Sequence, residues 1–181
     1  MWRLWTLGVE GGACWKRFWH CEGGSPAIEF ALVSPIIIAL LFCMVQVSVI
    51  FLAKFYLESA AEAGARLVLT NQVNAMTQTQ FQTAICSEIT ALFTCANVIV
   101  ELEQAPANAA SMTAAMPQFN ANGTLLNPTS FSLAASPSKM MLVVMYQWPV
   151  FGGPLGLNFA SFGNGTLLIA STHVFQIEPP I

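Results

Sequence analysis

Residues able to carry out acid–base, nucleophilic or metal chemistry are few in this sequence. It contains no aspartate, nine glutamates and two histidines, His20 and His173. A Ser, His, acid triad would have to combine His173 with a distant glutamate, and no nucleophile elbow is present to support it. The CxxC and HExxH spacings of metal sites are also missing. The sequence therefore predicts a protein that is not an enzyme, with no catalytic residue, no metal and no cofactor.

Cys86 and Cys95 are the cysteines best placed for a structural role. A disulfide between them would close a loop of about ten residues, which is worth about 2 to 3 kcal/mol in the chain-entropy description. The alternative is two buried free thiols, because nine residues of unbroken helix would place the two side chains on opposite faces. A disulfide therefore requires the helix that contains Cys86 to end before Cys95, near Phe93, and an oxidising compartment.

Glu29 stands directly before a long apolar segment. The 24 residues from Phe30 to Ala53 carry no charge, and as a helix they would extend about 36 Å, enough to cross a hydrocarbon core of about 30 Å. A cleaved secretory signal would have an apolar region of only about 7 to 15 residues. The sequence predicts one retained membrane span. Glu29 at its edge either reaches the lipid headgroups near the positive end of the helix or has a functional role.

Charge excludes one class of partner and says little about orientation. Only 8% of the residues are charged, the net charge is -3 and the six basic residues are scattered, so we expect no nucleic-acid binding. Lys16 and Arg17 before the apolar segment are balanced by Lys54 and Arg66 after it, and Arg3 favours a cytoplasmic N-terminus.

The pattern along the chain predicts an α+β protein. A long helix is expected from about Ala27 to about Asn71, loosened near Pro35, and a second over about Phe81 to Phe93, because apolar residues recur at helical spacing. Three strands are expected at 97–103, 139–151 and 163–178, the last entered through a turn at Asn164-Gly165. We divide the chain into a leader at 1–24, a membrane helix with its extension at 25–72, and an α+β domain at 73–181. Its segment 105–138 is rich in Ala, Ser, Asn and Pro and is expected to be flexible.

Smaller features of the sequence leave alternatives open. Gly64 in the first helix is either a close-packing contact or simply tolerated. Glu62 and Arg66 are spaced to attract each other on that helix. The sequence NGTLL occurs at Asn122 and at Asn164. We interpret each copy as a turn that leads into a strand, and not as part of a true repeat. Both copies also match the N-x-T glycosylation pattern, which often matches by chance.

The segment around Glu29 resembles the class III leader of type IV pilin-like proteins. Gly24 is followed by SPAI and then by Glu29-Phe30 and the apolar run. The resemblance implies that a prepilin peptidase cuts between Gly24 and Ser25, which leaves Glu29 at the fifth position of the mature chain. The new α-amino group would be a cation, and Glu29 of the same or an adjacent chain would be its natural partner.

Further motifs narrow this resemblance to TadE-like proteins, the minor pseudopilins of the tight-adherence (Tad, or Flp) pilus system. AIEFALVSPIIIALLF is similar to the opening of that family, and LESAAEAGAR to its segment ending in Gly64, Ala65 and Arg66. The cysteine pair, the Tyr146-x-Trp148 motif and FQIEPP at 175–180 resemble the family's tail. The related TadF-like proteins are the alternative within this group.

The resemblance implies a role in assembly. We expect a single-pass protein of the bacterial inner membrane with its C-terminal domain in the periplasm. Its expected partners are the prepilin peptidase, a second pseudopilin or the major pilin, and the inner-membrane assembly platform with its ATPase. The alternative function is a membrane-anchored binding or adhesion module without leader processing, in which Gly24 and Glu29 have no special role.

Overall fold

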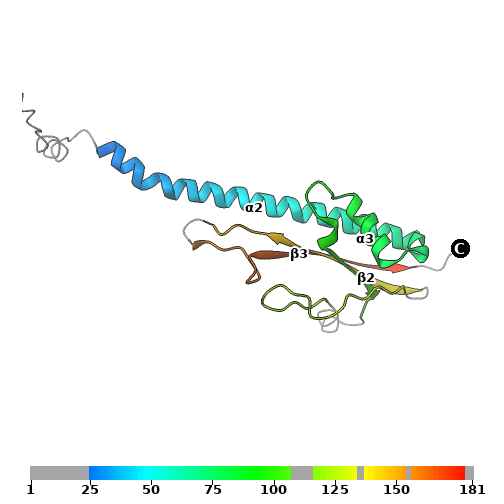
Figure 1. The fold of residues 1–181 in the computed structure, drawn as a ribbon. Helices are drawn as coiled ribbons and strands as arrows, with labels where there is room; N and C mark the ends of the chain where they lie inside the picture. The colour runs from blue at the N-terminus through cyan, green and yellow to red at the C-terminus, as the bar shows by residue number, and fades with distance from the viewer. Residues whose placement is uncertain (1–24, 107–115, 134–136, 154–155, 178–181) are drawn as a thin grey trace, which may run out of the picture. The chain divides into compact units, whose positions relative to one another are not determined.

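The computed structural model describes residues 25–106, 116–133, 137–153 and 156–177. The leader at 1–24, part of the expected flexible segment and the end of FQIEPP lie outside the described residues. Helices α2 (Ser25–Leu69) and α3 (Gln78–Ser87) precede the sheet, with short 3-10 helices at Gln72–Ala75 and Cys95–Asn97. The strands are β1 (Val98–Gln104), β2 (Ser138–Pro149) and β3 (Thr166–Ile177). Figure 1 shows the arrangement, and the α+β prediction is confirmed.

Helix α2 is the long helix that the sequence predicts. It begins at Ser25, so Pro26 lies in the first turn, where proline is tolerated because the first N–H groups have no helical partner. The helix continues through Pro35. It ends before Asn71, which has the left-handed φ of 57° that commonly follows a helix.

The chain divides into two compact units, residues 1–41 and 42–181, and α2 runs through the boundary. In the described part of the first unit, large apolar side chains are exposed along the helix. Phe30 is 73% exposed and Leu32 71%. Side chains that have no protein core to enter need another apolar environment, which is the property expected of a membrane helix.

In the second unit, one face of α2 is buried against the sheet. Its buried residues recur every three or four positions and are mostly small: Ala53, Leu57, Ala60, Ala61, Ala65 and Val68. Gly64 belongs to the same face, and a Cβ there would lie 2.7 Å from Cδ1 of Ile85 and 3.2 Å from Cδ2 of Leu142. Gly64 is therefore a close-packing position. On the exposed face, Arg66 and Glu62 form the expected ion pair at 2.7 Å.

Helix α3 is shorter and begins earlier than the sequence analysis predicts. It starts after a capping box in which the Thr77 hydroxyl accepts from the Gln80 N–H and the Gln80 side chain accepts from the Thr77 N–H. It ends at Ser87, not near Phe93, because the chain turns at once: the Ile89 N–H donates to the Cys86 carbonyl at 2.9 Å. Phe81 and Ile85, on the apolar face of this helix, are buried.

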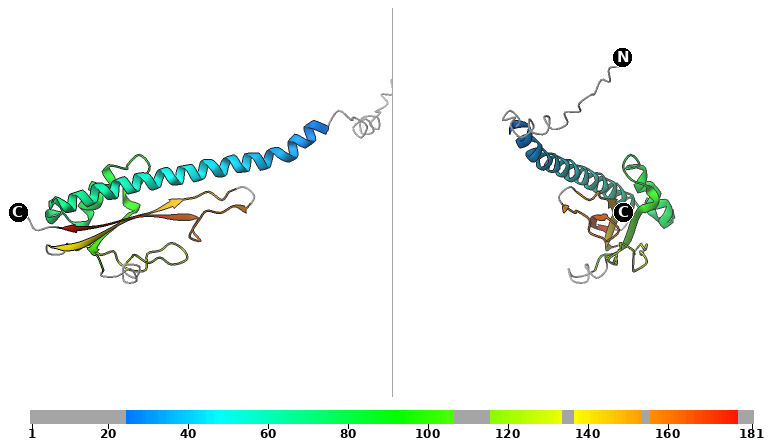
Figure 2. Two further views of the ribbon diagram at one scale, coloured as in Figure 1. Left: turned by 180° about the vertical axis from the view of Figure 1, so that it is seen from behind. Right: turned by 60° about the vertical axis from the view of Figure 1, so that its left-hand side comes forward.

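The sheet is antiparallel with the order β1-β2-β3. All three predicted strands are confirmed, and Gly165 has the positive φ of 77° that the turn before β3 requires. Figure 1 and Figure 2 show the C-terminal half of α2 and α3 on one side of the sheet and residues 116–133 on the other. The first side carries the main core, including Val100, Leu142 and Tyr146. The second side buries Met141, Val143 and Met145, with Phe119 packed on them.

Candidate functional site

The residues of the expected cleavage site lie at the start of α2. Gly24 is outside the described residues, and Ser25 is the first residue of the helix. Glu29 and Phe30 follow one turn later and are exposed. The backbone therefore places Glu29 at i+4 from Ser25, which is the spacing at which side chains or end groups of a helix are neighbours.

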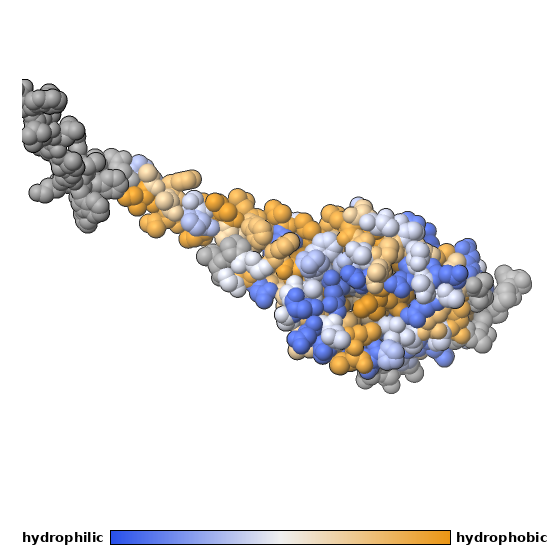
Figure 3. All heavy atoms as spheres, in the orientation of Figure 1, coloured by the Kyte–Doolittle hydropathy of each residue, from blue (hydrophilic) through white to orange (hydrophobic). Residues whose placement is uncertain are grey.

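One helix among the described residues is long and apolar enough to cross a membrane. Its candidate span is Pro26–Leu69. The most apolar part of this helix has a mean hydropathy of 2.8, and only 11% of that part is buried inside the protein. A core helix of a soluble protein would be mostly buried. Figure 3 shows hydrophobic side chains along much of the visible length of α2. Cys43, in the middle of this stretch, is a free thiol.

The β2–β3 loop, which we define as residues 150–153 and 156–165, meets α2 inside the uncharged stretch. The Gln46 side chain donates from Nε2 to the Phe151 carbonyl at 2.9 Å, across 105 residues of sequence. Around this bond lies an apolar groove of about 240 Å³, lined by Phe42, Val45, Gln46, Val49, Trp148, Pro149 and Phe151. Oε1 of Gln46 is buried and has no hydrogen-bond partner among the described residues.

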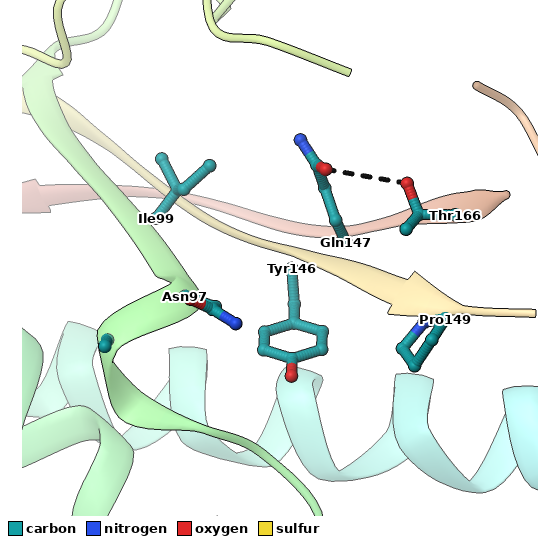
Figure 4. A pocket seen from close by; sticks show the side chains of 7 residues that line it. Asn97, Ile99, Tyr146, Gln147, Pro149 and Thr166 are labelled. Atoms are coloured by element: carbon teal, nitrogen blue, oxygen red, sulfur yellow. Dashed lines mark hydrogen bonds between the residues drawn. The ribbon is translucent and has the colours of Figure 1, made fainter. Parts of the chain in front are cut away.

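A larger cavity of about 520 Å³ lies where β1 begins, lined by Ala96, Asn97, Ile99, Tyr146, Gln147, Pro149 and Thr166. Val98 pairs with Tyr146, so β2 continues beyond the start of β1 from Gln147 onward. Figure 4 shows Tyr146 pointing to the side of α2 and Gln147 to the opposite side, with its hydrogen bond to Thr166. The cavity is thus an open edge of β2, and its lining includes no acid, histidine or thiol.

The two NGTLL sequences form neighbouring turns. Gly123 and Gly165 both have a positive φ, 79° and 77°. The Gly163 N–H donates to the Ala121 carbonyl at 2.8 Å, and Gln147 donates to the carbonyl of Gly123. Asn164 donates to Gln147 Oε1 at 3.4 Å. The repeated motif therefore builds two turns that are joined through Gln147, while only the second leads into a long strand.

An acidic pair on β1 is held by one serine from residues 116–133. The Ser130 hydroxyl lies 3.0 Å from Oε1 of Glu101 and 3.0 Å from Oε2 of Glu103. One hydroxyl hydrogen can serve only one carboxylate at a time. Burial raises the pKa of Glu101, the hydrogen bonds from Ser130 oppose this, and the Glu103 charge adds to the rise. Glu101 therefore takes up a proton more readily than an ordinary glutamate, and in that form it can donate to Ser130.

Cys86 and Cys95 are joined in a disulfide, with their Cα atoms 5.6 Å apart. Because α3 ends at Ser87, the chain can turn back and bring Cys95 next to Cys86. Gln82 supports the returning chain, because its Nε2 donates to the carbonyls of Cys95 and Val98. The disulfide and this side chain together fix the connection from α3 to β1.

The residues considered for catalysis and metal binding are not brought together in the described part of the chain. His173 lies opposite Leu142 in the sheet and lines neither of the two cavities. No group of three or more His, Cys, Asp or Glu side chains is placed to hold a metal among the described residues.

The tertiary roles of several polar residues are not apparent from the sequence. Gln46 was visible only as an interruption of the apolar run, and its partner Phe151 is far away in sequence. Ser130 lies in a segment that was expected to be flexible, yet it is bonded to Glu101. A polar residue inside an otherwise apolar span is the one signal that could have pointed to Gln46.

The fold and the site define a protein in which a candidate membrane helix continues into an α+β domain. The model of the TadE-like protein family matches residues 24–66, which confirms the resemblance over the residues from Gly24 to Arg66. The match relates the chain to the Tad pilus system and to a membrane. Comparisons with curated proteins and with solved structures found no match.

Proposed function

We propose that this protein is a minor pseudopilin of a Tad/Flp-type pilus or related secretion filament, made active by cleavage between Gly24 and Ser25. One observation carries the proposal: the family match begins at Gly24, and α2 begins at the next residue. A cut at this position would free a chain whose first residue already opens the membrane helix. The protein would then act by assembly and not by catalysis.

The proposed partners follow from the same position. A prepilin peptidase would recognise Gly24 and the residues around it. After cleavage the α-amino group of Ser25 would be one helical turn from Glu29, and the exposed apolar side chains of α2 would face lipid or the helices of other pilins. A second pseudopilin, the major pilin and the inner-membrane assembly platform are the proposed neighbours.

The proposed orientation puts the leader in the cytoplasm and residues 73–181 in the periplasm of the bacterial inner membrane. The Cys86–Cys95 disulfide supports it, because such bonds persist in oxidising compartments. Arg3 on the leader also favours a cytoplasmic N-terminus, whereas Lys16 and Arg17 are balanced by Lys54 and Arg66.

The test is the mass and N-terminal residue of the protein extracted from membranes, expressed with and without a prepilin peptidase. We expect the chain to start at Ser25 only when the peptidase is present and Gly24 is intact, so Gly24→Ala should keep the full leader. A chain that keeps its leader under every condition would contradict the pseudopilin proposal and favour an anchored binding module.

A further inference from the structure

The β2–β3 loop has a composition that is unusual for a surface loop. No Asp, Glu, Lys or Arg occurs between Lys139 and Glu178. The Phe151 side chain is 75% exposed and that of Leu157 is 44% exposed. Loops on a water-facing surface are normally polar, and exposed large apolar side chains grouped together indicate an interaction surface.

The position of this loop along α2 can be compared with the membrane. A hydrocarbon core of about 30 Å takes about 20 helical residues. Any 20-residue window within the uncharged stretch from Phe30 to Ala53 includes residues 34–49. All four α2 residues that line the groove, Phe42, Val45, Gln46 and Val49, fall in that range. If α2 spans a membrane, the loop that contacts them is at the depth of the lipid.

Gln46 would lie only a short distance below the C-terminal edge of the membrane span. Gln46 lies three to seven residues from the C-terminal edge of such a window, which at 1.5 Å a residue is about 5 to 10 Å. That is the depth at which interfacial apolar groups rest between the headgroups and the acyl chains. Phe151 is held at this level because its carbonyl accepts the Gln46 hydrogen bond.

Several polar groups of the loop and of this part of α2 have partners within the protein, which lowers the cost of placing them in lipid. The Gly153 N–H donates to the Leu157 carbonyl at 2.7 Å, and the Val150 N–H donates to that of Gly165 at 3.1 Å. On α2, the Ser48 hydroxyl donates to the Met44 carbonyl at 2.7 Å. The Gln46 amide, which would be costly alone in lipid, is used by the loop.

We propose that the β2–β3 loop is a second membrane contact, with Phe151 and Leu157 inserted among the lipids of the extracytoplasmic leaflet beside α2. The inference rests on the proposed membrane span. The loop would hold the α+β domain against the bilayer surface at a fixed rotation about α2, because the Gln46–Phe151 bond joins it to one face of the helix.

The test uses nitroxide-labelled cysteines in the full chain, reconstituted in phosphatidylcholine vesicles. Cys14, Cys21 and Cys43 are changed to Ser and the disulfide is kept. Labels are placed in separate variants, Phe151→Cys and Leu157→Cys in the loop, Ile38→Cys in the span, and Leu126→Cys and Val174→Cys as controls that are also exposed, 61% and 48%. Collision rates with oxygen and with a water-soluble nickel complex then report the depth of each label.

We expect the labels at 151 and 157 to be shielded from nickel to a degree between Ile38→Cys and the two controls. If the label at 38 is shielded and those at 151 and 157 match the controls, the loop inference is overturned and the span stands. If the label at 38 also meets nickel freely, the membrane span itself is wrong. If shielding at 151 disappears as the lipid-to-protein ratio rises, another copy covers the loop and the lipid contact is rejected.

A second pair of variants tests the link to α2. Gln46→Leu removes the donor to the Phe151 carbonyl, so the label at 151 should become more mobile. Ser48→Ala is the matched control, because the Ser48 hydroxyl bonds only within its own helix in the described structure. Equal mobility of the label in both backgrounds would show that Gln46 does not position the loop.

Discussion

Oε1 of Glu101 on β1 accepts a hydrogen bond at 3.0 Å from the hydroxyl of Ser130, which lies 29 residues further along the chain. The same hydroxyl also contacts Glu103. Oε2 of Glu101 and Oε1 of Glu103 are buried and have no hydrogen-bond partner among the described residues. Two carboxylates that share one donor repel each other when both are ionised, so a proton on one of them should strengthen this contact between residues 116–133 and the sheet.

Stability should therefore depend on pH through Glu101. Burial raises the pKa of Glu101 in the folded protein above its ordinary value of 4.5. The folded state then binds the proton more tightly than the unfolded state, so the stabilisation is complete below the ordinary pKa and is lost as the pH rises through the folded pKa. Thermal unfolding in detergent, followed across that range, should show greater stability on the acidic side from this group.

Glu101→Gln tests the assignment, because glutamine can donate to Ser130 and never becomes charged. We expect this variant to be more stable than the wild type at neutral pH and to lose this part of the pH dependence. Glu88→Gln, at an exposed acid that follows α3, is the matched control and should keep the wild-type profile. An unchanged profile in Glu101→Gln would contradict the role of Glu101.

Gly64→Ala should destabilise the α+β domain despite the better helix propensity of alanine. The added Cβ would lie 2.7 Å from Cδ1 and 2.9 Å from Cγ1 of Ile85, which is itself fully buried. Overpacking of this kind costs about 1 to 3 kcal/mol, against a propensity gain of at most about 1 kcal/mol. Urea unfolding of the detergent-solubilised protein would measure the difference.

Adding Ile85→Val to Gly64→Ala removes the methyl group nearest to the new Cβ and should recover part of the stability. Gly152→Ala is the control, because a Cβ at Gly152 meets nothing within 4 Å. If Gly64→Ala is as stable as the wild type, the close approach of α2 to Ile85 is not tight enough to matter.

Removing the disulfide should destabilise the fold. Replacing both Cys86 and Cys95 with Ala frees a loop of about ten residues in the unfolded state, which is worth about 2 to 3 kcal/mol. Unfolding curves with and without reductant should differ for the wild type and coincide for the double variant. Cys43→Ala is the control: it keeps the disulfide, so reductant should still shift its unfolding curve. If reductant does not shift the unfolding curve of the wild type, the disulfide adds no stability.

Local sequence patterns were enough to predict the elements of this fold. Uncharged apolar residues followed by good helix formers predict α2, and runs of β-branched and aromatic residues predict β2 and β3. The end of α3 was predicted wrongly because apolar spacing continues to Leu92, while the turn after Ser87 depends on local hydrogen bonds. The capping box at Thr77 and Gln80 is the signal in the sequence that marks the true start of α3.

Contacts between distant polar groups were beyond such patterns. The bonds from Gln46 to Phe151 and from Ser130 to Glu101 each depend on how separate elements pack, which no local window contains. Gly64 shows the same limit, since the sequence left open whether it was a packing contact and only the position of Ile85 decides.

Glu29 should matter for assembly more than for cleavage. At i+4 from Ser25 it can pair with the α-amino group that a cut after Gly24 creates, in its own chain or in a neighbour. We expect Glu29→Gln to start at Ser25 like the wild type when the peptidase is present. It should nevertheless be lost from the sheared filament and assembly fraction, because a neutral amide cannot pair with the new cation.

The matched control is Glu58→Gln, an exposed acid on the same helix, which should be both cut and recovered with the assembly fraction. N-terminal sequencing and quantification of the protein in membrane and filament fractions separate the two steps. Glu29→Asp, which keeps the charge on a shorter side chain, should retain part of the recovery. If Glu29→Gln is cut and recovered as fully as Glu58→Gln, the carboxylate has no role in docking, and Glu29 is instead a residue whose charge only reaches the headgroups at the start of α2.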